Sequence, residues 1–459
     1  MAELHELDAH ELSAAISAEE VSCVEVAQHF LDRISTDTHG AFITVTAEKA
    51  LAQAAAVDAT AMTERPTFAG VPFAVKDLTP TAGIRTTMGS VRLADNVPTR
   101  DAWVVELMEQ AGFISLGKTN TPEFGLSSYT DNDIVGPART PADPSRNAGG
   151  SSGGAAAAVG AGLVPLALGS DGGGSIRIPA SCCGVVGFKP SRGRISNGPE
   201  SALWNGLTTD GALTQTVRDA ALVLDVLCRP MPGDSRVWQK PAEPFVQALR
   251  ETPEPLTIAT WSKPYLDFVD ASPEAVAAVA HAREQLEALG HTVVEIDNPW
   301  PAALEPQFNV VWSAGMAAAP IPPEFVSMLR SNTQYWFERG GKASAPQLAA
   351  AMSFIEVTTS NVMAGLREFD AFLTPTLALP PQPHEWFTES GDPLEDHRRE
   401  LLFTPYTALM NMSGQPAVSL PLYESAATAD RPALPIGVML AAHVGDDALL
   451  LSLAQQLHP

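Results

Sequence analysis

Two serine-bearing glycine loops hold the residues of this chain best suited to chemistry. The first loop reads Gly-Gly-Ser-Ser-Gly-Gly and contains Ser151 and Ser152, and the second reads Asp-Gly-Gly-Gly-Ser-Ile-Arg and contains Ser175. Glycine at this density lets the backbone turn sharply or approach another group closely, because glycine adopts positive φ without strain. A serine among bare backbone N–H groups can act as a nucleophile beside an oxyanion hole, provided that a base takes its proton.

Two widespread motifs fit parts of these segments but not their surroundings. Ser151 satisfies the G-x-S-x-G pattern of a nucleophile elbow, which requires a strand directly before it. Residues 141–147 precede it and contain two prolines and several turn formers, which exclude a central strand. A phosphate-binding loop requires Gly-Lys-Ser/Thr at the end of its turn, and neither serine loop has it. The full pattern occurs at Gly112–Thr119, whose middle is apolar and typical of a strand.

A lysine is a candidate for the base, because no histidine is close to either loop in sequence. None of the ten histidines lies between His39 and His281, although a distant one could still fold into the site. Lys76 follows the apolar segment Val71–Val75, for which we expect a buried strand. Burial lowers the pKa of a lysine from about 10.4 by several units and yields a neutral amine that accepts a proton. Taken alone, however, this segment favours an ordinary exposed lysine at a strand end.

The order of these segments resembles the amidase signature family, which hydrolyses amide bonds with a Ser-cisSer-Lys triad. The resemblance is strong over about residues 65–230 and thinner beyond them. It rests on Val75–Asp77, the two serine loops, Gly83–Ser90, Gly117–Phe124 and Cys183–Pro190, with weaker likeness at Asp370–Thr376 and Asn411–Val418. So many ordered segments do not coincide by chance.

Carried over position by position, the resemblance implies a three-residue proton relay. It makes Ser175 the nucleophile, Ser151 the bridging serine and Lys76 the base. Neutral Lys76 would take the proton of Ser151 while Ser151 takes that of Ser175, and Ser175 would form an acyl-enzyme that water hydrolyses. The family also implies a cis peptide bond between Gly150 and Ser151. This mechanism needs no metal and no organic cofactor.

The glycine loop around the nucleophile is expected to stabilise the oxyanion. Each such donor contributed about 2.7–4 kcal/mol in a well-studied protease. The expected donors are the backbone N–H groups of Gly172, Gly173, Gly174 and Ser175. We expect Ser152, Asp171 and Arg177 to support the loop rather than to react, since buried charges of opposite sign pair with each other.

The sequence says least about the substrate pocket. In the family, the loop before the bridging serine lines part of it, which here implicates Gly125, Leu126, Ser127 and Tyr129. Aromatic candidates for the rest are Trp204, Trp312, Phe325, Trp336 and Phe354. For each of these taken alone, a place in the core is favoured over the pocket, because aromatic side chains fill the cores of most proteins. Residues 299–360 match no segment of the family, so the substrate stays open among amides, anilides, esters and carbamates (urethanes).

Composition predicts an acidic enzyme without a nucleic-acid or membrane partner. The 459 residues include 28 Lys and Arg against 53 Asp and Glu, for a formal net charge of −25. Such a surface repels phosphate backbones and anionic lipids. The N-terminus lacks the pattern of a signal peptide, with no Lys or Arg before Arg33, so we expect a cytoplasmic protein. The uncharged stretch Gly153–Gly169 is too short for a membrane span, and we expect a buried helix followed by a strand.

Cysteine usage indicates packing rather than chemistry. Cys23, Cys182, Cys183 and Cys228 have no metal-ligand spacing. We expect the adjacent pair to be small apolar residues of a packed segment.

Alternating helices and strands predict an α/β/α sandwich around a large mixed sheet, as in the family. We expect a single domain over residues 1–459, with N-terminal helices in 1–64, a catalytic core in 65–230 and a variable part in 231–459. The expected helices are Ala18–Ile34, with a capping box from Ser17 and Glu20, then Ala47–Met62, Arg100–Gly112, Asp219–Cys228, Pro273–Leu289 and Asp446–Leu457. The expected strands are Phe113–Leu116, Leu256–Thr260, Thr292–Ile296, Ala371–Leu373, Ala417–Leu422 and Pro435–Ala441, with a loop over 229–255.

Three functions stay open at this point. A stand-alone hydrolase of small amides, anilides or carbamates is favoured. The amidase component of an aminoacyl-tRNA amidotransferase would need a partner subunit for the nucleic acid, and the thin C-terminal resemblance argues against it. A catalytically silent binding protein on the same fold is disfavoured because Lys76, Ser151 and Ser175 are all present. Many members of the family pair as homodimers, so a homodimer is expected as an option here too.

Overall fold

The strands of the protein form one continuous sheet. The computed structural model describes residues 3–199, 203–234, 238–251, 253–319, 321–429 and 431–458. The strands in these ranges are β1 Phe42–Val45, β2 Pro72–Lys76, β3 Ile114–Thr119, β4 Leu166–Asp171, β5 Val186–Lys189, β6 Thr209–Thr214, β7 Thr257–Thr260, β8 Thr292–Glu295, β9 Ala371–Pro375, β10 Ala417–Glu424 and β11 Pro435–Ala442. Their order in the sheet is β1-β3-β2-β4-β6-β5-β10-β11-β9-β7-β8. The β2–β3, β2–β4, β7–β8 and β7–β9 pairs are parallel and the others antiparallel, so the sheet is mixed as predicted.

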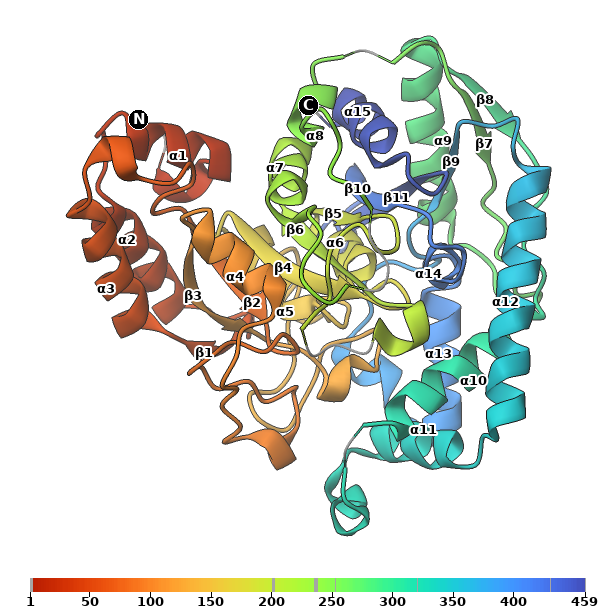
Figure 1. Cartoon of the computed structure of the whole chain (residues 1–459). Coiled ribbons are helices and arrows are strands. Elements are labelled where there is room, and N and C mark those ends of the chain that lie inside the picture. Colours follow the sequence, from red (N-terminus) through yellow and green to blue (C-terminus); the bar gives the residue numbers. More distant parts are fainter. Residues whose placement is uncertain are drawn as a thin grey trace.

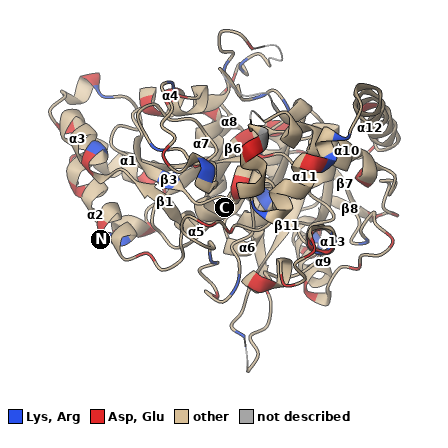
Figure 2. Cartoon of the chain, turned by 90° about the horizontal axis from the view of Figure 1, so that it is seen from below, with Lys and Arg blue, Asp and Glu red and all other residues tan. Residues whose placement is uncertain are grey.

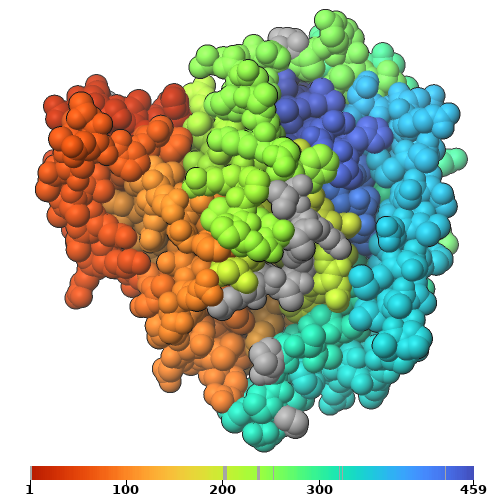
Figure 3. All heavy atoms as spheres, in the orientation of Figure 1, coloured from red at the N-terminus to blue at the C-terminus, as the bar shows by residue number. Residues whose placement is uncertain are grey.

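Helices surround this sheet along its whole length. They are α1 Ala9–Ser17, α2 Cys23–Ser35, α3 Ala47–Asp58, α4 Trp103–Gln110, α5 Gly153–Gly160, α6 Arg177–Cys183, α7 Val217–Leu227, α8 Phe245–Ala248, α9 Pro273–Ala288, α10 Leu304–Ala317, α11 Ser331–Gly341, α12 Ala345–Gly365, α13 Pro393–Phe403, α14 Ala408–Ser413 and α15 Asp447–Leu457. Helices α1 to α3 lie at the β1 end of the sheet, and α9 and α12 lie at the β7–β8 end (Figure 1). The same two flanks stand apart in Figure 3 as the red and the cyan surfaces.

Two hydrophobic cores lie on the two faces of the sheet. Along β11, Val438 and Leu440 belong to one core cluster, whereas Met439 and Ala441 belong to the other. Successive side chains of a strand point to opposite faces, so each face is covered by its own apolar layer. This arrangement confirms the predicted α/β/α sandwich.

The N-terminal helices begin and end at other residues than predicted. Instead of one helix over Ala18–Ile34, α1 ends at Ser17 and α2 begins after Ser22. Ser22 and Glu25 have the same spacing as Ser17 and Glu20, and they form the capping box. The carboxylate of Asp58, the last residue of α3, accepts the N–H groups of Cys23 and Val24 at 2.9 and 3.0 Å. This tertiary contact fixes the start of α2 and is not visible in the local sequence.

The other predicted elements are present with shifts of a few residues at their ends. Ser272 caps α9 through its side chain and Pro273 occupies its first turn, as predicted. The predicted loop over 229–255 contains the short helix α8, and the unmatched interval 299–360 folds into α10, α11 and α12. All four cysteines are free and buried, as expected for packed small residues.

Acidic residues are distributed over several elements of the chain (Figure 2). Asp and Glu positions occur on helices at both ends of the sheet (Figure 2). Within the described ranges, no helix is both long enough and apolar enough to cross a membrane.

Candidate active site

Lys76 is the last residue of β2, and it points into the interior. Its side chain is fully buried, and Nζ donates a hydrogen bond of 2.7 Å to Ser151 Oγ. Nζ also lies 3.3 Å from the carbonyl oxygen and 3.2 Å from Oγ of Ser170. Burial lowers the pKa of Lys76 to about 7, although the carboxylates of Asp171 and Asp210 oppose this shift. The alternative of an exposed lysine at a strand end is therefore wrong.

Ser151 lies in a loop that packs tightly between neighbouring segments. The Gly150–Ser151 peptide bond is cis, as the resemblance implied. The carbonyl oxygen of Ser151 accepts a hydrogen bond of 3.0 Å from Thr121 Oγ1. A methyl group added at Gly150 would lie 2.7 Å from the carbonyl oxygen of Tyr129, so the close approach of these two backbones requires glycine. The loop passes directly into α5, which begins at Gly153.

Ser175 lies beside this loop, in the turn between β4 and α6. Its carbonyl oxygen accepts the N–H of Ser152 at 3.1 Å, which joins the two serine loops through their backbones. Its side chain keeps a small exposed fraction of 8%, whereas Ser151 is almost closed off at 2%. In the described part of the chain, no hydrogen bond links the hydroxyls of Ser151 and Ser175. The structure therefore joins Lys76 to Ser151 directly and joins Ser175 to them through the backbone.

A buried ion pair holds the turn that contains Ser175. The guanidinium of Arg177 donates to both carboxylate oxygens of Asp171, at 2.9 and 3.0 Å, and both side chains are fully buried. Asn411, on α14, bonds both partners: Nδ2 donates to Asp171 Oδ1 at 2.9 Å, and Oδ1 accepts from Arg177 at 2.7 Å. Burial alone would raise the pKa of Asp171, but Arg177 holds it at about 2. The sequence indicated the ion pair; it did not indicate Asn411, although Asn411 begins one of the segments that resemble the family.

The backbone N–H groups of the glycine turn differ in whether they already have a hydrogen-bond partner. The N–H of Gly174 donates to Asp171 Oδ1 at 2.8 Å and is therefore not free for an oxyanion, contrary to the expectation from sequence. Gly172, Gly173 and Ser175 have N–H groups without a hydrogen-bond partner among the described residues. Thr407 Oγ1 donates to the carbonyl oxygen of Gly173 at 2.7 Å and fixes that peptide. Three of the four expected donors thus remain available.

An aromatic cluster stands against this glycine turn. A methyl group added at Gly172 would lie 3.0 Å from Trp312, and one added at Gly173 would lie 3.2 Å from Phe308. The ring centroids of Phe308 and Trp312 are 5.4 Å apart in a stacked arrangement. Trp204 lies 5.2 Å from Trp312, and its Nε1 donates to the Trp312 carbonyl oxygen at 3.0 Å. Trp204 and Trp312 were predicted, but Phe308 was missed; its i, i+4 spacing from Trp312 on α10 was the available signal.

The remaining pocket candidates are divided between the site and the core. Gly125 lies at the site: it has φ of +69°, and a methyl group there would lie 3.2 Å from Ser151 Oγ. Leu126 packs in the second hydrophobic core. Ser127 Oγ accepts from Asn332 at 2.9 Å. The ring of Tyr129 stacks on that of Phe387 at 4.7 Å, so its side chain serves packing.

Three further aromatic candidates have surroundings of their own. Phe325 lies under the guanidinium of Arg92, 3.7 Å from the ring centroid. Trp336 is buried in the second core, against the ring of His397. Phe354 is 38% exposed on α12. Within the described ranges, no hydrogen bond or ring contact joins these three side chains to the serine loops.

Sequence reasoning missed a second carboxylate near Lys76. Asp210 lies on β6 directly opposite Ser170 of β4. Its Oδ2 accepts a hydrogen bond of 2.9 Å from Asn197. Burial raises the pKa of Asp210 to about 7, and the proximity of Lys76 opposes this rise. Asp210 belongs to no motif, and only the strand register brings it to the lysine.

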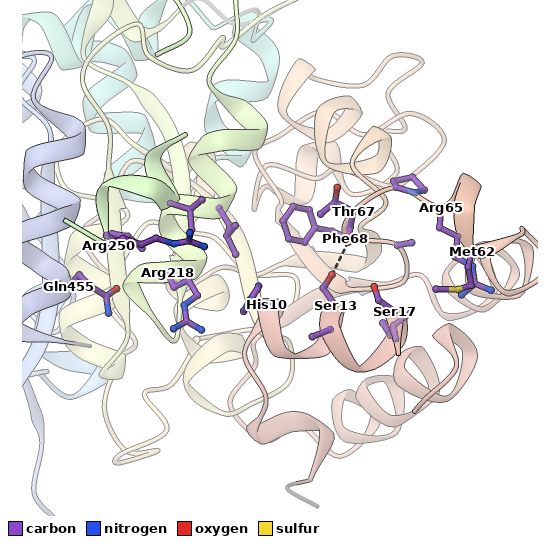
Figure 4. A pocket seen from close by; sticks show the side chains of 17 residues that line it. His10, Ser13, Ser17, Met62, Arg65, Thr67, Phe68, Arg218, Arg250 and Gln455 are labelled. Carbon is purple, nitrogen blue, oxygen red and sulfur yellow. Dashed lines mark hydrogen bonds between the residues drawn. The ribbon is translucent and has the colours of Figure 1, made fainter. Parts of the chain in front are cut away.

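A large cavity lies apart from these residues. It has a volume of about 690 Å³ and is lined from α1, residues 62 and 65–69, α7, α8, residues 249–250 and α15 (Figure 4). It shares no lining residue with either serine loop and does not include Lys76. Its size therefore says nothing about the room around the serines.

Comparison with known proteins identifies the family. A family model described as Amidase matches residues 25–451. The chain belongs to the amidase family. This amidase is 36% identical to a putative amidase of Synechocystis sp., over 98% of this chain and 88% of the relative. It is 35% identical to a subunit of the glutamyl-tRNA(Gln) amidotransferase of Thioalkalivibrio sulfidiphilus, over 99% and 97% of the two chains.

The fold of the amidase is also found among solved structures. It superimposes on 6-aminohexanoate cyclic dimer hydrolase with a TM-score of 0.88 and 30% identity, covering 99% of this chain and 97% of the other. The amidase is thus an enzyme that hydrolyses amide C–N bonds.

Proposed function

We propose that this amidase hydrolyses small-molecule amides through an acyl-enzyme on Ser175, with Ser151 and Lys76 as the proton relay. The observation that carries the proposal is the contact of 2.7 Å between the buried Nζ of Lys76 and Ser151 Oγ. A lysine whose pKa burial lowers to about 7 is largely neutral at slightly alkaline pH, so it can accept the proton of Ser151.

The relay then runs in two directions during one turnover. Ser151 passes its proton to Lys76 and takes the proton of Ser175, which attacks the substrate carbonyl carbon. Catalytic hydrogen bonds are often loose before substrate binds, and rotation of the Ser175 side chain brings its hydroxyl to Ser151. The proton returns along the same residues to the leaving nitrogen, and water attacks the ester that remains on Ser175.

The free N–H groups of Gly172, Gly173 and Ser175 are the proposed oxyanion donors. They are fixed by the ion pair between Asp171 and Arg177, so they need no reorganisation when charge develops on the substrate oxygen. Ser152, whose N–H bonds the Ser175 carbonyl, supports the loop.

We further propose that the aromatic cluster binds one side of the substrate. Phe308 and Trp312 stand directly against the glycine turn, so an apolar or aromatic group attached to the reacting carbonyl would contact them. Amides, anilides and carbamates (urethanes) with such groups are the substrate classes to test.

The proposal also covers the organisation of the chain. The sheet joins strands from residues 42 to 442, which supports a single domain over 1–459 that contains the N-terminal helices, the catalytic core and the variable part. We propose that it needs no nucleic-acid partner and that it forms a homodimer. Light scattering after size exclusion measures the latter.

A fluorophosphonate probe tests the assignment of the nucleophile. The purified chain should take up one probe group, located by mass spectrometry on Ser175, and Ser175→Ala should abolish the labelling. Ser151→Ala should slow it strongly. Ser152→Ala is the matched control, since the neighbouring hydroxyl has no place in the relay, and it should label at the normal rate. Labelling that persists in Ser175→Ala would refute the assignment, and a chain that never labels would favour a silent binding protein.

One relative supports a second candidate function. The similarity to the glutamyl-tRNA(Gln) amidotransferase protein extends over almost the whole chain, so a role as the amidase component of such a complex is the alternative. Turnover of an aryl amide by the purified single chain favours the stand-alone enzyme. Activity that depends fully on a partner protein would favour the alternative.

A further inference from the structure

We propose that Asp210 is a positioning residue whose negative charge sets the pH range in which Lys76 works as a base. The inference rests on the proposed role of Lys76 and adds a residue that lies outside every motif of the sequence. Three observations support it. They are the register of β4 against β6, the hydrogen bonds that hold Asp171 in the nucleophile turn, and the few hydrogen bonds of Asp210 itself.

The register of the sheet brings Asp210 to the lysine. Ser170 on β4 and Asp210 on β6 are directly opposite in an antiparallel pair. Opposite residues of such a pair project from the same face, with Cβ atoms about 4.5–5.5 Å apart. The Ser170 hydroxyl accepts from Lys76 Nζ at 3.2 Å, so this face is the one that holds the amine. Asp210 therefore lies on the lysine side of the sheet, beside Ser170.

The second carboxylate near the amine has its hydrogen bonds elsewhere. Asp171 acts more strongly on Lys76 than Asp210 does, but its bonds to Arg177, to Asn411 and to the N–H of Gly174 also hold the nucleophile turn, so it cannot be replaced without disturbing that turn. Among the described residues, the side chain of Asp210 has a single hydrogen-bond partner, the uncharged Asn197. Of the two acidic groups that act on Lys76, Asp210 is thus the one without a cationic partner of its own.

The effect of this charge has a definite sign. Burial raises the pKa of Asp210 and lowers that of Lys76, and each group opposes the shift of the other, so the two titrate as a coupled pair. In the form in which both groups are charged, Asp210 attracts the proton on the amine and opposes its loss. Without the charge, the amine becomes neutral at lower pH. Asp210 therefore keeps the onset of base activity near neutral pH.

The test is the pH profile of kcat/KM in Asp210→Asn. Asparagine keeps the shape and can still accept from Asn197, so the fold should survive, and a melting curve verifies it. The acid limb of the profile should move to lower pH, by at most about one unit, while Asp210→Glu should restore the normal limb. Asp219→Asn is the matched control: burial raises the pKa of Asp219 to about 7 as well, but its carboxylate bonds the N–H groups of Ala9 and His10. Its acid limb should not move.

The outcomes separate this inference from the proposed function. If Lys76→Ala is inactive and Asp210→Asn keeps the normal acid limb, the role of Asp210 is refuted while the relay stands. If Lys76→Ala retains normal turnover, the relay itself is refuted. An equal displacement in Asp219→Asn would also overturn the inference, since it would show that any buried acid has this effect.

A different observation carries a second inference, at the cavity apart from the serines. The geometry points to a binding site for a small organic anion with an apolar body, such as an alkyl carboxylate. Although acidic residues far outnumber basic ones in the chain, the lining of this cavity contains Arg65, Arg218, Arg250 and His10 and no Asp or Glu. Figure 4 shows Arg218, Arg250 and His10 toward one end and Arg65 toward the other, with Phe68 between them.

The cavity offers both kinds of contact that such a ligand needs. The guanidinium groups of Arg218 and Arg250 make no hydrogen bond or ion pair with any described residue, so they are free to pair with a carboxylate. Apolar side chains, among them Phe68, Leu222 and Leu249, line the same space. A volume of about 690 Å³ is within the usual range of about 300–1,000 Å³ for small-molecule sites.

Calorimetric titration of the full chain with octanoate tests this site. Octanoate should bind, and the double variant Arg218→Ala, Arg250→Ala should weaken it about tenfold or more. The matched control is Arg367→Ala, which removes an exposed arginine outside the cavity, and it should bind octanoate normally. Octylamine and inorganic phosphate should bind far more weakly, since each lacks one of the two features. Absence of octanoate binding, equal binding by the double variant, or equal binding of either comparison compound would overturn the inference.

Discussion

Lys76 and Ser151 are 75 residues apart in the chain, yet Nζ and Oγ lie 2.7 Å from each other in a fully buried contact. As the structure has it, the lysine donates this hydrogen bond. In the proposed reaction the same pair must also work in the reverse direction, with the neutral amine accepting the serine proton. This double use explains why the environment of the amine matters as much as its position.

Removal of this amine should abolish turnover. In Lys76→Ala, Ser151 loses the acceptor of its proton, so kcat should fall by about 10⁴-fold, as for members of other catalytic triads. Circular dichroism and a melting curve check that the fold persists. Normal kcat in a folded variant would contradict the relay.

The activity should rise with pH through neutrality. Only the neutral amine accepts a proton, and burial lowers the pKa of Lys76 to about 7. Below that pH, kcat/KM should therefore fall about tenfold for each unit, and above it the value should level off. A profile of kcat/KM on an aryl amide between pH 5 and 9 measures this. A flat profile from pH 5.5 to 8 would exclude an amine base.

Loss of the buried guanidinium should destabilise the nucleophile turn. Arg177→Ala leaves the carboxylate of Asp171 fully buried without its cation, which costs about 3–5 kcal/mol. Urea unfolding measures the change in the free energy of unfolding. Arg398→Ala breaks an exposed ion pair with Glu395 and should cost at most about 1 kcal/mol. Equal losses in the two variants would contradict the role of the buried pair.

A methyl group at Gly125 should impair catalysis, not only stability. Gly125 and Gly83 both have positive φ, so alanine at either position should cost about 1–2 kcal/mol. A methyl group at Gly125 would approach Leu78 to 2.4 Å and Ser151 Oγ to 3.2 Å, whereas one at Gly83 meets nothing within 4 Å. Gly125→Ala should therefore lower kcat about tenfold or more. Gly83→Ala, the matched control, should lose stability and keep its kcat.

The aromatic cluster should determine the preference for the acyl group. Phe308→Ala removes the ring closest to Gly173, so the ratio of kcat/KM for a benzoyl amide over an acetyl amide should fall about tenfold. Phe354→Ala removes an exposed ring of α12 and should leave this ratio unchanged. An unchanged ratio in both variants would place the acyl group elsewhere.

Motif order and apolar periodicity were enough to predict a mixed sheet, most helices and the pairing of Lys76 with Ser151. The cis bond before Ser151 and the ion pair of Asp171 with Arg177 followed from the same resemblance. These features depend on short stretches of sequence or lie in segments that resemble the family. They can therefore be predicted without knowledge of the fold.

The wrong predictions and the missed residues all depend on the folded arrangement of the chain, which local sequence patterns do not reveal. The start of α2 depends on Asp58 of another helix, which local capping patterns do not reveal. Gly174 was expected to be an oxyanion donor, but the folded turn directs its N–H to Asp171. Asp210 and Phe308 reach the site through strand register and through a helix in an unmatched interval.

The position of β10 and β11 in the sheet has a consequence for biosynthesis. These two strands follow every other described strand in the sequence, yet they lie between β5 and β9 in the sheet. Asn411, which bonds both Asp171 and Arg177, precedes them directly. A nascent chain still attached to the ribosome with these residues inside the exit tunnel therefore has neither the middle of its sheet nor the brace of its nucleophile turn. The assembled site therefore requires residues 411–442 to have left the tunnel.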